Sequence, residues 1–149
     1  MFQAWQSGGL RPGDLRELIP DIWLYLDPPA GTRGPLNDSQ WLELFTATGY
    51  FVGPPYLAFN LTDPMRLFRA APSERTQGMS WCTHRAMAER FVPRHSQWGE
   101  YKVWSADVPR TAILATLCRV DDTLFDQPFG SVREIVVDPR GLPPVLRCS

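Results

Sequence analysis

Prolines and glycines divide this chain of 149 residues into short segments. There are 15 prolines and 11 glycines, and both residue types disrupt the interior of helices and strands. Eight phenylalanines and six tryptophans lie among these breaks. Large aromatic side chains bury much apolar area per residue. The sequence therefore predicts short elements, joined by many loops, around a compact aromatic core.

The length of the chain fits one domain, because a chain of this size can bury most of its unfolded surface in a single core. Hydrophobic residues make up 44% of the sequence and charged residues 21%, which is typical of a globular protein. The formal net charge of -1 gives no support for non-specific binding to nucleic acids. We expect a single domain over residues 1–149, with an N-terminal arm and helix over 1–65 and a motif-bearing core over 66–140.

The cysteines and the apolar segments of the sequence indicate where in the cell the protein is expected. Cys82, Cys118 and Cys148 are odd in number and have no Cys-x-x-Cys spacing, which indicates neither a disulfide framework nor a zinc knuckle. The N-terminal residues lack a basic region followed by an apolar run, and no apolar stretch approaches the roughly 20 residues that span a bilayer. We therefore expect a cytoplasmic protein with reduced thiols, without secretion or membrane insertion.

In the N-terminal half, the sequence predicts one helix. Residues 1–38 contain several proline and glycine pairs, which predict an irregular arm. Asp38 or Ser39 is expected to cap a helix over 40–48 that ends near Gly49. Residues 53–55 then break the chain, and residues 60–64 are typical of a loop.

In the second half, the pattern changes to strands. Alternation and short apolar runs predict strands over 66–70, 79–82, 101–108, 112–117 and 134–137. Thr83 is expected to cap a helix that carries Met87 and Phe91 four residues apart and ends at Pro93. One helix among several strands predicts an α+β fold.

Three polar residues stand in largely apolar segments. Arg69 needs an anionic or carbonyl partner if it is buried, Ser80 lies in a short strand, and Glu134 stands at the start of a strand. Each also has a structural interpretation, as an ion-pair partner, an exposed strand residue or a solvated strand end. A carboxylate beside a ribose, however, stabilises the positive charge that develops on the sugar carbon when a glycosidic bond breaks.

Taken together, these segments resemble the motifs of the ADP-ribosyltransferase superfamily, in its arginine-serine-glutamate branch. Residues 67–70 resemble the aromatic-arginine motif, residues 78–91 the serine motif with its following helix, and residues 134–139 the catalytic-glutamate strand. The resemblance covers residues 66–140, about half of the chain. It implies a split, mostly antiparallel sheet with an N-terminal helical arm.

The resemblance also implies an activity, which is cleavage of the nicotinamide–ribose bond of NAD and transfer of ADP-ribose to an acceptor. Glu134 would be the catalytic residue, which binds the nicotinamide ribose and stabilises the transition state. Arg69 would hold the phosphate and ribose of NAD, Ser80 would shape the nicotinamide side, and the Ala70 backbone would bind the nicotinamide amide. The remaining cofactor-binding positions are Trp81, Thr83 and Phe91, whose aromatic members either stack on NAD or pack in the core. NAD is the cosubstrate, and no metal is implied.

Two positions depart from the family pattern. Cys82 stands where a third small hydroxyl residue is common, and Val132 stands where arginine-modifying relatives carry glutamate or glutamine. The acceptor is therefore open among another protein side chain, a nucleic-acid base, a small molecule and water, and water would make the protein an NAD glycohydrolase. Arg133 either meets an anionic acceptor or faces solvent. The biological setting is equally open among a toxin, a phage or defence effector and a housekeeping modifier.

A thiol or metal site is a rival interpretation. Cys82, His84 and His95 suggest a thiol nucleophile with a histidine base or part of a metal site, but a buried cysteine with two surface histidines explains them more simply. Asp121 and Asp122 likewise fit a solvated turn better than a pair of metal ligands.

A second rival is a non-catalytic interaction domain that keeps the transferase-like fold. Its N-terminal aromatic residues would then bind a partner protein, although packing within the chain is the simpler explanation. These residues are Trp5, Trp23, Tyr25, Trp41 and Tyr50.

Overall fold

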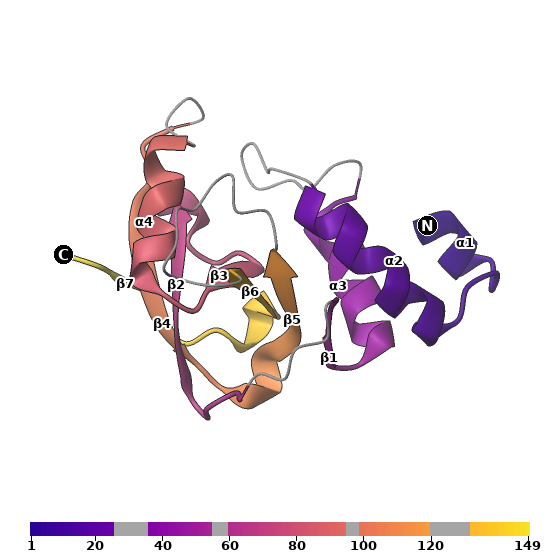
Figure 1. Cartoon of the computed structure of the whole chain (residues 1–149). Helices are drawn as coiled ribbons and strands as arrows, with labels where there is room; N and C mark the ends of the chain where they lie inside the picture. The colour runs from indigo at the N-terminus through magenta and orange to yellow at the C-terminus, as the bar shows by residue number, and fades with distance from the viewer. Residues whose placement is uncertain (26–35, 55–59, 95–98, 120–131) are drawn as a thin grey trace.

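The computed structural model describes residues 1–25, 36–54, 60–94, 99–119 and 132–149. His95, Asp121 and Asp122, named above as candidates, lie outside these ranges. Figure 1 shows the helices and strands of the chain. The helices are α1 (Phe2–Gln6), α2 (Pro12–Tyr25), α3 (Asp38–Thr48) and α4 (Arg85–Arg94), with the short 3-10 helices η1 (Ser73–Arg75), η3 (Arg110–Ala112) and η5 (Pro139–Gly141). The strands are β1 (Phe51–Val52), β2 (Met65–Ala71), β3 (Ser80–Cys82), β4 (Lys102–Val108), β5 (Ile113–Arg119), β6 (Val132–Val137) and β7 (Leu146–Arg147).

These strands form one seven-stranded sheet in the order β1-β5-β6-β3-β2-β4-β7. Only the β1–β5 pair is parallel among the described strands, so the predicted α+β fold, with a mostly antiparallel sheet, is confirmed. Pairing is uneven along the sheet. Strands β2 and β4 pair along all of β2, whereas β2 and β3 share one register pair, Phe68 with Cys82. The sheet is therefore weakly joined beside Arg69, which follows Phe68 directly.

The described part of the N-terminal arm is helical, so the prediction of an irregular arm over 1–38 is wrong there. Pro12 stands at the first position of α2, where the N–H that proline lacks has no helical partner. Leu15, Ile19 and Trp23 then follow at four-residue spacing, and all three are buried. This apolar face stabilises α2 despite Pro20 in its interior.

Helix α3 begins at Asp38, and its cap is Asn37 rather than Asp38 or Ser39. The Asn37 side chain accepts a hydrogen bond from the Gln40 backbone N–H at 2.9 Å, while the Gln40 side chain accepts one from the Asn37 N–H at 3.0 Å. This reciprocal capping box satisfies two backbone donors at the helix start. The helix ends at Thr48, and Gly49 follows with a φ of 63°, a conformation that favours glycine.

Two boundaries in the second half also differ from the prediction. Helix α4 begins at Arg85, because His84, rather than Thr83, supplies the first carbonyl acceptor, and it continues through Pro93 to Arg94. The Thr83 hydroxyl instead bonds to the ring of His84 at 2.9 Å. Strand β6 begins at Val132, which places Glu134 in the interior of the strand rather than at its start.

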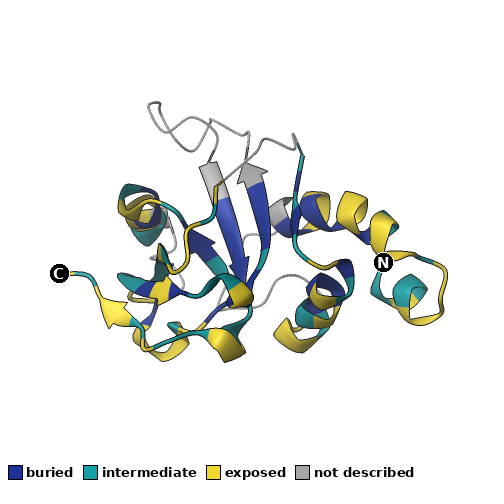
Figure 2. Ribbon diagram, turned by 90° about the horizontal axis from the view of Figure 1, so that it is seen from below, coloured by how far each residue is buried: buried dark blue, intermediate teal, exposed yellow. Residues whose placement is uncertain are grey.

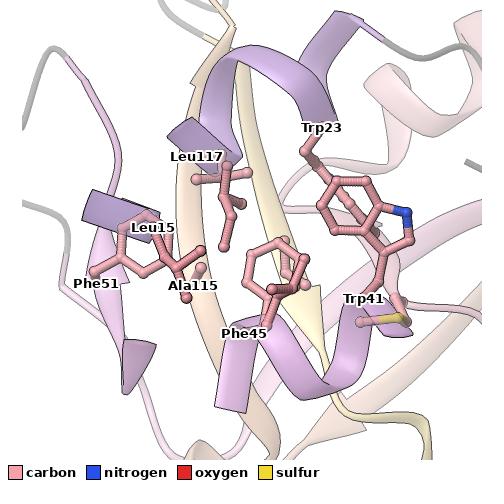
Figure 3. Close-up of a cluster of buried hydrophobic side chains, with 11 residues drawn as sticks. Leu15, Trp23, Trp41, Phe45, Phe51, Ala115 and Leu117 are labelled. Carbon is pink, nitrogen blue, oxygen red and sulfur yellow. The ribbon is translucent and has the colours of Figure 1, made fainter. Parts of the chain in front are cut away.

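The largest hydrophobic cluster joins helices α2 and α3 to the sheet (Figure 3). The Trp23 ring meets the Trp41 ring edge to face, with centroids 5.1 Å apart, and the Phe45 ring in the same way at 5.0 Å. Ala115, Leu117 and other sheet residues complete the cluster. Trp23 and Trp41 are therefore core residues here, with 1% and 0% exposure, and not parts of an open surface for a partner.

A second cluster covers the opposite face of the sheet. It contains Trp81 and Ile135, with Leu67 and Val108 from β2 and β4. Figure 2 shows the central strands coloured as buried, with exposed residues on the outer helices and loops. In the described parts of the chain, no helix is long and apolar enough to cross a membrane.

The Glu134 side chain lies on the face of the sheet that the helices cover. Side chains two residues apart in a strand share a face, so Glu134 lies on the side of Val136, which packs in the cluster of α2 and α3. Its register partner Cys82 contacts Met87 of α4 on the same face. Figure 1 shows α4 beside β2 and β4, and α2 with α3 toward the β5 end of the sheet. On this face, therefore, helices α2 and α3 pack near one end of the sheet and α4 packs nearer the other.

Candidate active site

The strand order brings three of the seven predicted site residues together. Strands β2, β3 and β6 are neighbours in the sheet and carry Arg69, Ser80 and Glu134 respectively. Arg69 Nη1 donates a hydrogen bond to the Ser80 carbonyl oxygen at 2.9 Å. Ser80 Oγ donates a hydrogen bond to Glu134 Oε1. A continuous set of polar contacts therefore runs from the arginine through the serine to the glutamate.

Arg69 bridges the weak junction between β2 and the segment that precedes β3. Besides its bond to Ser80, its Nε and Nη2 atoms donate to the Arg75 carbonyl oxygen, both at 3.4 Å. Its guanidinium also lies against the backbone of Gly78, where a Cβ atom would stand 2.2 Å from Arg69 Nη2. Glycine at position 78 therefore makes room for the arginine.

Glu134 is 6% exposed, and its Oε1 atom accepts hydrogen bonds from two elements. One donor is Ser80 Oγ, and the other is Trp23 Nε1 of α2, at 2.8 Å. Hydrogen bonds offset part of the cost of burying a charged group. Trp23 is absent from the motif-based set of site residues, because it lies 111 residues from Glu134 and no local spacing connects the two.

A cavity of about 320 Å³ adjoins these contacts. Trp23, Arg69 and Ser80 line it together with Asp38 and residues 74–79. Its volume is within the range of small-molecule sites. The lining residues include two arginines, Arg69 and Arg75, and two acidic residues, Asp38 and Glu74. Residues of both charges are therefore available to anionic groups and hydroxyls of a ligand.

The other predicted cofactor-binding residues occupy different surroundings. Ala70 follows Arg69 in β2 and is half-buried. Trp81 is fully buried in the second cluster, on the opposite face of the sheet, where its Nε1 donates to the Gly78 carbonyl oxygen at 2.8 Å. Phe91 packs against the small cluster of Cys82 and Met87, and Thr83 bonds to His84. Within the predicted set, hydrogen bonds join Arg69 to Ser80 and Ser80 to Glu134.

The two positions that depart from the motif pattern lie close to Glu134 in the sheet, Cys82 across the strand pair and Val132 along β6. Cys82 is buried and pairs with Glu134 in register across β3 and β6. Val132 and Arg133 belong to β6, where they pair with Arg119 and Cys118. The side chains of Val132 and Arg133 lie outside the described part of the structure.

The thiol and metal interpretation finds little geometric support. Cys82 is buried in the sheet, whereas His84 is exposed at the start of α4. Within the described ranges, no group of three or more histidine, cysteine, aspartate or glutamate side chains is arranged to hold a metal ion.

A charged pair follows the strand that carries Glu134. Asp138 Oδ2 lies 2.8 Å from Arg140 Nη2, and Asp138 Oδ1 accepts a hydrogen bond from the Arg140 N–H at 3.0 Å. The side-chain hydrogen bond from Arg140 holds the pKa of Asp138 below its usual range. An ionised Asp138 therefore caps η5 directly after β6.

Comparisons with known proteins assign no family. No family model matches the chain, and neither a curated protein nor a solved structure matches it. Its motifs and the geometry of this site are the basis for assigning a function.

Proposed function

We propose that the protein is an NAD-dependent ADP-ribosyltransferase, which cleaves the nicotinamide–ribose bond and passes ADP-ribose to an acceptor. One observation carries this proposal: Arg69, Ser80 and Glu134 lie on three neighbouring strands and are linked through Ser80. These are the three residue types that the resemblance assigns to NAD binding and catalysis. Spacing along the chain did not require them to meet.

Glu134 is the catalytic residue in this mechanism. As the bond between ribose C1′ and the nicotinamide nitrogen breaks, nicotinamide leaves with the electron pair and positive charge develops on the sugar. The buried carboxylate of Glu134 accepts a hydrogen bond from a ribose hydroxyl and stabilises that charge. The acceptor then attacks C1′ and loses its proton. Water as the acceptor gives free ADP-ribose.

Arg69 has two tasks in this mechanism. Its permanent positive charge lies on the wall of the cavity, where it meets the phosphates of NAD. Its bonds to the carbonyl oxygens of Ser80 and Arg75 also hold the start of β3 in place. Arg69→Ala should therefore weaken NAD binding through loss of charge and loss of local order.

The decisive test compares Glu134→Gln with the wild type. The amide keeps the shape of the side chain but removes its charge, so we expect nicotinamide release to fall by about 100-fold or more. Binding of NAD, measured by isothermal titration, should change by no more than about threefold, because the lost interaction acts mainly in the transition state. Glu89→Gln, which changes an exposed glutamate of α4, is the matched control and should keep full activity.

Full turnover by Glu134→Gln would contradict the assignment of the catalytic residue. If neither the folded wild type nor Arg69→Ala binds NAD, the enzyme proposal fails and the interaction-domain hypothesis is favoured. The acceptor is identified by incubating the protein with labelled NAD and cell extract, followed by separate protease and nuclease treatment. Label in protein, in nucleic acid or only in free ADP-ribose distinguishes the transferase activities from the glycohydrolase.

A further inference from the structure

Helix α2 contributes a hydrogen-bond donor to the acidic residue of the site. We propose that Trp23 is a positioning residue, whose indole N–H holds the Glu134 carboxylate in the orientation that NAD cleavage requires. This role rests on the proposed function. It extends the site beyond residues 66–140, the part of the chain that carries the family resemblance, into the N-terminal arm.

The contact has the geometry of a strong hydrogen bond. Trp23 Nε1 lies 2.8 Å from Glu134 Oε1, and both residues are buried, at 1% and 6% exposure. Hydrogen bonds with an ionised partner are roughly twice as strong as neutral ones. The indole nitrogen is a donor only, so Trp23 serves Glu134 as a fixed dipole that points at the carboxylate.

Two donors act on the same carboxylate oxygen. Ser80 Oγ approaches Glu134 Oε1 from the sheet, and Trp23 Nε1 approaches it from α2. The terminal torsion of a glutamate side chain is soft, so one donor leaves the carboxylate freer to rotate than two do. Together they preset its orientation before substrate arrives, which lowers the cost of reaching the transition state.

The position of Trp23 is itself fixed by the aromatic cluster. Its ring meets the rings of Trp41 and Phe45 edge to face, at interplanar angles of 83° and 89°. Figure 3 shows Trp23 beside Trp41, with Phe45 close to them. Rotating the indole away from Glu134 would disrupt both ring contacts. The core of the arm therefore sets the geometry of the carboxylate.

The hydrogen bond between Trp23 and Glu134 also lies next to the cavity that could hold a ligand. Trp23 and Ser80, which both donate to Glu134 Oε1, line the cavity of about 320 Å³. Substrate bound there would lie against the pair of residues that orients the carboxylate. A change confined to the indole N–H should consequently affect the chemical step, whereas truncation of the ring would also remove buried core contacts.

The sharpest test replaces Trp23 with 3-benzothienylalanine, which has sulfur in place of the indole N–H and nearly the same size and shape. We expect kcat for nicotinamide release to fall by about tenfold to a hundredfold. KM and Kd for NAD should stay within about twofold of the wild type. The same replacement at Trp41, in the same aromatic cluster, is the matched control and should leave kcat near the wild-type value.

A double-mutant cycle separates positioning from packing. Ser80→Ala removes the other donor to the same oxygen, so its effect on kcat and that of the Trp23 replacement should be strongly non-additive. Trp23→Phe provides a second variant, which removes the donor by ordinary mutagenesis and keeps an aromatic ring in the cluster.

The possible outcomes are distinct. Unchanged kcat in both Trp23 variants, with an active wild type, would overturn the positioning role and leave the proposed function intact. A higher KM at unchanged kcat would also overturn it, because Trp23 would then contact NAD instead of orienting Glu134. Additive effects with Ser80→Ala would show that the two donors act independently and would overturn their joint orientation of Glu134. Failure of the wild type to release nicotinamide would refute the proposed function and this role together.

Discussion

At the residue scale, the position of the Arg69 side chain depends on Gly78, whose lack of a Cβ atom makes room for the guanidinium. The guanidinium donates to two carbonyl oxygens and lies against the Gly78 backbone. Both partners are neutral carbonyl groups, so these bonds do not themselves neutralise the positive charge of the arginine. Gly78 is therefore part of the surroundings that hold Arg69 in position, although glycine has no functional group in its side chain.

Gly78→Ala should impair the site more than the fold. The added Cβ atom would stand 2.2 Å from Arg69 Nη2, so the guanidinium must move and lose its hydrogen bonds to Ser80 and Arg75. The displaced group is the flexible end of a side chain, so we expect a modest loss of stability, about 1–2 kcal/mol. NAD affinity should fall by about tenfold, measured by isothermal titration.

Gly13→Ala is the matched control for this variant. No atom lies within 4 Å of a Cβ at position 13, and alanine favours the helix that contains it. Gly13→Ala should keep NAD affinity and unfold at the same or a higher temperature. If Gly78→Ala bound NAD with wild-type affinity, the present position of Arg69 would not be required for NAD binding.

At the element scale, local patterns located most of the strands and α3, while helix caps and the arm were less well predicted. Alternation placed β2 and β4 to within one residue at each end, since it reflects burial on one face of a sheet. The four-residue spacing of Leu15, Ile19 and Trp23 was also readable, but the flanking prolines and glycines favoured an irregular arm. Pro12 begins a helix there instead of breaking one.

The capping box of α3 gives a prediction at this scale. Asn37→Ala removes the acceptor for the Gln40 N–H and leaves the first turn of the helix with an unsatisfied donor. The free energy of unfolding should fall by about 1 kcal/mol. For a chain of this length, that corresponds to a decrease in melting temperature of about 2–4 °C, measured by calorimetry.

Ser39→Ala is the natural comparison, because Ser39 is exposed within α3 and was a candidate cap. It should change the melting temperature by less than about 1 °C, since ordinary surface substitutions have small effects. A larger decrease in Ser39→Ala than in Asn37→Ala would contradict the assignment of Asn37 as the cap.

At the scale of the whole molecule, the helical arm and the strands share one hydrophobic cluster. Side chains of α2 and α3 pack with Ala115, Leu117 and Val136 of the sheet. The same arm supplies Trp23 to Glu134. Shared burial of this kind couples the stability of the arm to that of the sheet, which the single-domain prediction over 1–149 also requires.

We therefore expect one cooperative unfolding transition. Denaturation followed by far-ultraviolet circular dichroism and by tryptophan fluorescence should give coincident curves. Leu44→Ala, a truncation in the shared cluster, should shift both curves equally and cost about 2–5 kcal/mol. Separate transitions for the two probes, or a shift in only one, would indicate that the arm and the motif-bearing core unfold independently.

The amino-acid sequence was sufficient for the α+β class, for most strands and for the choice of Arg69, Ser80 and Glu134 as candidates. These features depend on alternation, spacing and short motifs, which are local in the chain. The tertiary structure was needed to join them, because strand order decides which strands are neighbours. It was also needed to find Gly78 beneath Arg69 and Trp23 beside Glu134. Contacts between residues far apart in sequence arise from packing of the whole chain, and no local pattern encodes them.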